Sequence, residues 1–318
     1  MAAPDATAAR PGEAYGGSSD PLELFLKVFS GEVITAFERQ NIMMDRHMVR
    51  TIKNGKSAQF PKVWRATAEM HTPGTLITGN SVEHAEREIS IDGLLIAPIF
   101  IANIDEAMNH YDVRSIYSTE AGRILGMTFD ENVMKEIVKG AAASSQFSDA
   151  GVAGTVIIDE DFDSSTLATQ AEALAEGLFT AAKDLDEEDV PMEGRTAIFP
   201  PSYYYALVQS AKAINKDFGG RGSYANGDVL RIAGFEVLKS NNVPTTNTTG
   251  SDSYHGVDAS DTCGIMFGKQ AAGTVKLLDL KVESEYDITR QGTWIVAKYA
   301  VGHGYLRQEA CISFDHTA

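Results

Sequence analysis

A long apolar stripe restricts the fold of this chain more than any other feature of its sequence. From Asp105 to Lys139, apolar and small side chains recur every three or four residues, which is the period of one helix face. Asp105 and Glu106 favour a first helical turn, and Gly140 follows Lys139 as a typical end. At 1.5 Å per residue such a helix is roughly 50 Å long, so it predicts a strut rather than one element of a small domain. Its apolar stripe includes Met108, Tyr111, Leu125, Phe129 and Val133, which are the predicted packing positions.

The remaining periodic segments predict a mixed α+β fold. Residues 274–282, 293–301 and 306–314 are expected to be strands that pack against the long helix as one lobe. A second lobe contains an amphipathic helix over 167–185, with shorter elements around it. These shorter elements are strands at 197–199 and 234–238, a helix near 202–214 and a polar loop at 240–262.

Residues 53–102 are predicted to form one long hairpin that begins after the turn Asn54-Gly55. Its tip, residues 70–83, is expected to be too polar to fold back into a core. The segment around its first leg has six bases and no acid, in an otherwise acidic chain. These bases are Arg46, Arg50, Lys53, Lys56, Lys62 and Arg65.

The net charge of −17 argues against sequence-independent binding to nucleic acid, which requires neutralisation of phosphates. Twelve acids lie between Asp159 and Glu193, against the single base Lys183. We therefore expect the basic hairpin of one copy to contact acidic surface on a second copy. The alternative is a solvated hairpin on a monomer. The predicted acidic partners are Asp105, Glu106, Asp112, Asp186, Glu187 and Glu188.

No catalytic, cofactor or metal site is predicted. The spacing of Asp159, Asp161 and Asp163 imitates a calcium loop, but the glycine and the glutamate that such a loop needs at positions six and twelve are missing. Cys263 and Cys311 are interpreted as free thiols, because two cysteines form neither a disulfide framework nor a zinc set. No apolar run is long enough for a membrane helix, and no signal peptide is recognised.

Several short sequence motifs resemble those of major capsid proteins of short-tailed, T-seven-like bacteriophages, which have the Hong Kong 97 type of capsid fold. The most specific is the ten-residue motif Glu106–Ser115, and the similarity extends over residues 22–312. The other motifs are Phe25–Phe29, Gly31–Val33, Arg46–Arg50, Gly55–Pro61, Ile91–Leu95 and Ala297–Gly304. Residues before 20 and the loop at 245–262 depart from the pattern.

This resemblance implies an N-terminal arm (1–52), an extended loop (53–102), a peripheral domain (103–155 and 270–318) and an axial domain (156–269). It also implies a structural subunit of the virion, not an enzyme, whose copies form the pentamers and hexamers of an icosahedral head. The implied partners are a scaffolding protein, a portal at one vertex and packaged double-stranded DNA, without a membrane or cofactor. Assembly is expected in the host bacterial cytoplasm, through a procapsid that later expands. The alternatives are an encapsulin-like nanocompartment shell and, from another class, a soluble hydrolase.

Overall fold

The computed structural model describes residues 42–63, 68–77, 79, 82–104, 113–145, 153–209 and 231–317. Two compact units contain these residues. The first includes Gly93–Phe129 and Leu277–Val301, and the second comprises Ile42–Asp92, Asp130–Lys276 and Gly302–Ala318. One long helix and two long strands each contribute residues to both units. Among the described residues, no helix is long and apolar enough to cross a membrane.

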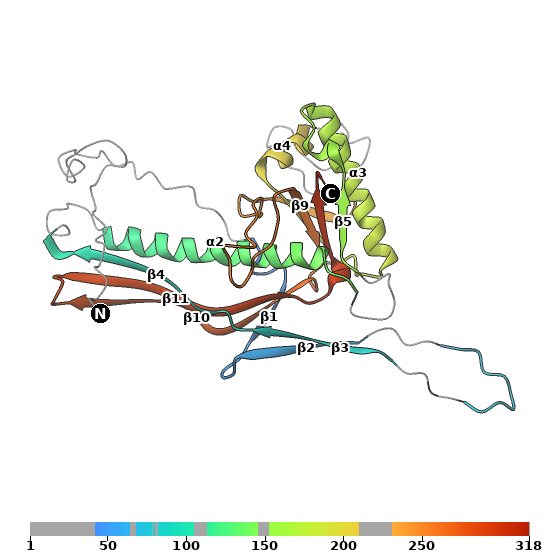
Figure 1. Ribbon diagram of the computed structural model, residues 1–318, viewed down its shortest axis with the longest axis horizontal. Helices are drawn as coiled ribbons and strands as arrows, with labels where there is room; N and C mark the ends of the chain where they lie inside the picture. The colour runs from blue at the N-terminus through green and yellow to red at the C-terminus, as the bar shows by residue number, and fades with distance from the viewer. Residues whose placement is uncertain are drawn as a thin grey trace. The chain divides into compact units, whose positions relative to one another are not determined.

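The first part of the long helix, the strand β4 and most of the strands β10 (Ala272–Asp287) and β11 lie in the first unit (Figure 1). Helix α2 spans Val113–Ala141, so the predicted end at Lys139 is early by two residues, and the predicted start lies outside the described residues. Strand β4, Gly93–Ala102, pairs antiparallel with β11, Gly292–Tyr305. The ring centroids of Phe129 and Tyr299 are 6.5 Å apart, and the Tyr299 hydroxyl donates to the Leu125 carbonyl oxygen at 3.0 Å. The stripe therefore packs against β11, one of the three strands predicted to form a lobe with it. The prediction of one lobe is wrong for the last of the three, β12 (Cys311–Asp315), which belongs to a different sheet in the second unit.

Three of the five predicted packing positions are confirmed as buried: Leu125, Phe129 and Val133. Met108 and Tyr111 lie outside the described residues. The last turn of α2 packs in the second unit, where a Cβ on Gly140 would lie 2.7 Å from the Cys311 sulfur. The absence of a side chain at Gly140 thus permits close contact with strand β12, Cys311–Asp315.

Replacing Leu125 by Ala is expected to lower the free energy of unfolding by about 2 to 5 kcal/mol, since the side chain is only 2% exposed and its loss leaves a cavity. Urea unfolding of the unassembled chain measures this change. The matched control is Ile124→Ala on the same helix, at a side chain that is 47% exposed. A loss at Leu125 no greater than that at Ile124 would show that the stripe does not carry the packing.

The hairpin of the second unit is shorter than predicted. Strand β2, Ser57–Val63, pairs antiparallel with β3, His84–Ser90, so that Ser57 faces Ser90 and Val63 faces His84. The prediction that one hairpin extends to residue 102 is wrong, because β4 pairs with β11 instead. An apolar run indicates a strand but does not identify its partner. Strand β1, Met48–Thr51, precedes the hairpin and pairs parallel with the start of β10, Ala272–Asp287.

A six-stranded sheet with two helices forms the rest of the second unit (Figure 1). The helices are α3, Leu167–Glu187, and α4, Pro201–Gln209. Leu174 of α3 and Leu207 of α4 share one core with sheet residues such as Phe235. The strands follow the order β5 (Thr155–Ile158), β12, β9 (Thr262–Phe267), β6 (Thr196–Phe199), β8 (Phe235–Lys239) and β7 (Arg231–Ile232).

Two segments that the sequence analysis interpreted otherwise contain short 3-10 turns. The last strand was expected to begin at residue 306, but it begins at Cys311, after the turn η5 at Gln308–Ala310. The calcium-like aspartates form the turn η3, Glu160–Asp163, in which the Asp159 carboxylate accepts from the backbone N–H of Asp161 at 2.9 Å. The closely spaced aspartates thus belong to a local turn before α3, which the Asp159 side chain caps.

Candidate inter-subunit surface

The hairpin tip exposes large apolar side chains. Residues 72–75 make a turn in which the Thr75 N–H donates to the Thr72 carbonyl oxygen at 3.1 Å. Around it Met70, Leu76 and Ile77 are 99%, 89% and 76% exposed. The described part of the tip is therefore not folded back into a core, as expected, and its apolar side chains are exposed.

The base of the hairpin is packed against its own chain. Ala58 and Ile89 are buried together with Val275 and Leu306. The Arg87 guanidinium lies 4.0 Å above the centre of the Tyr305 ring, which is a cation–π geometry. This packing fixes the base within the second unit and leaves the exposed tip for other contacts.

Lys62 is part of this anchor, and the expectation that it contacts a neighbouring subunit is wrong. Its amine lies 2.7 Å from a Glu309 carboxylate oxygen and 3.2 Å from the Gln308 amide oxygen. The side chains of Lys62 and Glu309 are 4% and 2% exposed. Burial lowers the pKa of the Lys62 amine, and the Glu309 carboxylate opposes part of that shift. The sequence gives no sign of this pair, because its members are separated by 247 positions.

Three of the six predicted bases remain on the surface. Lys53 and Lys56 are exposed and flank Gly55, whose φ of +118° fits the glycine of a tight turn. Arg50 is also exposed, and its guanidinium donates to the Gln59 carbonyl oxygen at 2.9 Å. Arg46 instead forms an ion pair with Glu236 at 3.0 Å in the same chain. Arg65 lies outside the described residues.

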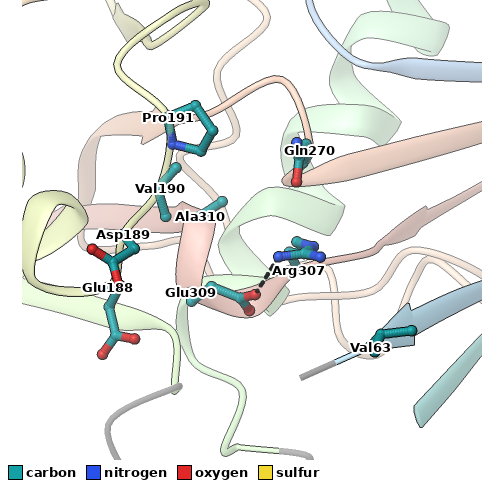
Figure 2. A pocket seen from close by; sticks show the side chains of 9 residues that line it. All are labelled: Val63, Glu188, Asp189, Val190, Pro191, Gln270, Arg307, Glu309 and Ala310. Carbon is teal, nitrogen blue, oxygen red and sulfur yellow. Dashed lines mark hydrogen bonds and ion pairs between the residues drawn. The ribbon is translucent and has the colours of Figure 1, made fainter. Parts of the chain in front are cut away.

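The predicted acidic partners on α3 are at the surface, with partners of their own. A carboxylate oxygen of Asp186 lies 2.7 Å from Arg195, and one of Glu187 lies 3.6 Å from Lys183. The next acidic residue, Glu188, lines a pocket with a volume of about 170 Å³. Figure 2 shows this pocket, with Glu188 on one side and Arg307 on the other. Asp105, Glu106 and Asp112 lie outside the described residues.

The described cysteines are not activated nucleophiles. Both Cys263 and Cys311 are free and buried. Burial raises the pKa of the Cys263 thiol to about 11, so it stays protonated at neutral pH, although His316 is 3.7 Å away. Burial raises the pKa of Cys311 as well. Across the part of the chain that the structure describes, no group of three His, Cys, Asp or Glu side chains is arranged to hold a metal ion.

Comparison with known proteins decides the family. The model of the Gp10A-like family, described as major capsid protein, matches residues 59–314. The chain belongs to this family. It is 33% identical over 322 residues to the major capsid protein of Escherichia phage T7, covering 94% of this chain and 93% of that protein. It is 34% identical over 321 residues to the major capsid protein of Enterobacteria phage T3, covering 92% and 91%.

Solved capsids agree with the fold. The capsid structure of the cyanophage P-SCSP1u has a TM-score of 0.79 and 42% identity, covering 98% of this chain and 99% of that one. The mature capsid of bacteriophage PhiM1 has a TM-score of 0.77 at 17% identity, covering 95% of each chain, and so supports the fold alone. The expected Hong Kong 97-like fold is confirmed, and this phage major capsid protein is a component of the virion head.

Proposed function

We propose that copies of this major capsid protein form the pentamers and hexamers of an icosahedral phage head around double-stranded DNA. The observation that carries the proposal is a hairpin whose base is buried in its own chain while its tip exposes Met70, Leu76 and Ile77. A hairpin with an anchored base and an exposed apolar tip is suited to contacts between copies. In this proposal a scaffolding protein directs assembly of a procapsid in the host cytoplasm, a portal occupies one vertex, and the shell expands as DNA enters.

The exposed bases near the base of the hairpin would orient its contact with a neighbouring copy. Arg50, Lys53 and Lys56 would face acidic surface on the next copy, at Asp186–Glu188 or near Asp105, Glu106 and Asp112. Each exposed ion pair contributes only about 0 to 1 kcal/mol. Repetition over every subunit of a closed shell makes this small term decisive for orientation and register. Weak pairs also permit rearrangement during expansion.

We assign the hairpin to the extended loop, residues 156–269 to the axial domain, and residues 103–155 with 270–318 to the peripheral domain. The net charge of −17 suits the inner wall of such a container. A wall that does not neutralise phosphates adds little affinity for DNA that must be packaged and then ejected.

Expression of the full chain with and without a scaffolding protein tests the function. We expect uniform shells in negative-stain images when the scaffold is present, and capsomers or irregular assemblies when it is absent. Small monodisperse particles under both conditions would favour an enzyme. Uniform closed shells in the absence of any scaffold would favour a nanocompartment shell.

Removal of residues 1–20 is expected to change assembly and leave the fold intact. This segment contains almost no large apolar side chain, so it has little surface to contribute to a core. Circular dichroism and thermal unfolding of the truncated chain should match those of the full chain, whereas the yield of shells should fall. An insoluble truncation with reduced helical signal would contradict this expectation.

A further inference from the structure

A buried histidine in the loop between β8 and β9 lies between two carboxylates. The His255 side chain is 4% exposed. Its Nε2 is 2.8 Å from a carboxylate oxygen of Asp92, and its Nδ1 is 3.0 Å from one of Glu136. Asp92 follows β3, the return strand of the hairpin, and Glu136 is on α2. One imidazole ring therefore joins three segments that are distant in the sequence.

The geometry requires a charged ring. A neutral imidazole has one N–H and can donate to only one carboxylate, whereas an imidazolium donates from both nitrogens. Burial alone would lower the pKa of His255, but Asp92 and Glu136 raise it to about 9. At neutral pH His255 is thus an imidazolium paired with both carboxylates.

The surrounding charged and titratable groups support this assignment. On α2, Lys139 pairs with Glu136 at 2.7 Å, and Lys135 pairs with Asp252 at 3.1 Å. Within the loop, Asp252 accepts from the His255 backbone N–H at 2.9 Å. On β11, the ring of His303 lies 5.4 Å from that of His255.

Burial and the nearby charge of His255 hold the pKa of His303 well below its usual value. His303 Nδ1 lies 2.9 Å from the Thr274 hydroxyl, which in turn lies 2.7 Å from Nε2 of His47. Burial also lowers the pKa of His47. Of His47, His255 and His303, therefore, His255 is the charged one.

Close backbone packing places the hairpin end beside this histidine. A Cβ on Gly302 would lie 2.0 Å from the Ser90 carbonyl oxygen, and one on Gly304 would lie 3.0 Å from the Ile89 side chain. Glycine therefore permits β11 to approach β3 closely, but supplies no side chain to hold it. The hydrogen bond that His255 Nε2 donates to the Asp92 carboxylate supplies a polar attachment at this point.

We propose that His255 is a charge-dependent latch, which fastens the return end of the hairpin to α2 and to the 240–261 loop and releases Asp92 when the ring loses its proton. A neutral ring would bond only one carboxylate and would leave the two anions facing each other without a cation between them. The latch lies within one chain, so it extends the proposed function without depending on contacts between copies.

Hydrogen exchange with mass spectrometry on the full-length unassembled chain tests the latch. After correction for the intrinsic effect of pH, we expect exchange in residues 84–92 to rise at least about tenfold between pH 7 and pH 10 in the wild type. His255→Gln cannot titrate and should show less than about a twofold change. The control His84→Gln removes an exposed histidine from the same strand and should behave like the wild type.

Asp92→Asn provides a second test that keeps the size of the side chain. It should raise exchange in residues 84–92 at pH 7, while residues 248–257 stay protected because Glu136 still holds His255. The proposal is overturned if wild type and His255→Gln share the same pH dependence, or if Asp92→Asn leaves exchange in residues 84–92 unchanged.

Discussion

Glu309→Ala is expected to lower the free energy of unfolding by about 3 to 5 kcal/mol, because it removes the carboxylate from a buried ion pair. The Lys62 amine lies 2.7 Å from Glu309, and both side chains are almost fully buried. The variant would leave a cation in the interior beside the Gln308 amide oxygen but without its carboxylate partner. Urea unfolding of the unassembled chain measures the loss.

The double variant Lys62→Met with Glu309→Leu is the matched control. Removal of both charges with comparable volume is expected to cost much less than Glu309→Ala, since no uncompensated charge remains. A loss of unfolding free energy below about 1 kcal/mol for Glu309→Ala would show that the pair does not anchor the hairpin. An equal loss for the single and the double variant would show the same.

Reversal of charge at Arg50, Lys53 and Lys56 together to Glu is expected to leave the subunit folded and to weaken assembly. All three side chains are exposed, so their replacement costs little stability. At about 0 to 1 kcal/mol for each pair, the loss for each subunit reaches a few kcal/mol, and shell yield should fall at least about tenfold. Sedimentation across a salt series measures yield, and the remaining assembly should be more sensitive to salt.

The control reverses three exposed bases away from both proposed surfaces, Arg231, Lys269 and Arg290, and reaches the same net charge. It separates a local contact from a general effect of added negative charge. Equal shell yield for the two variants, or unchanged yield for the hairpin variant across the salt series, would refute the role of the basic hairpin.

Periodic features of the sequence predicted their elements well. The stripe that includes Leu125, Phe129 and Val133 predicted a helix, and all three side chains are buried. Local patterns determine such an element because the helix period recurs along the chain itself. The family resemblance then gave the capsid fold that the solved capsids confirm.

Partners distant in the sequence could not be predicted in this way. The apolar run in β4 indicates a strand, yet its pairing with β11 depends on residues about 200 positions away. Lys62 looked like the other bases of its segment until the structure placed it on Glu309. His255 belongs to a loop with no periodic signal, and its carboxylate partners come from two other segments.

A cryo-electron microscopy map of assembled shells tests the central claim most directly, because it traces each hairpin from its base to its tip. The account predicts that residues 68–77 lie against a neighbouring copy, with Met70, Leu76 and Ile77 covered and Arg50, Lys53 and Lys56 facing acidic side chains of that copy. A map in which the tip folds onto its own subunit, or is surrounded by solvent in every copy, would contradict it.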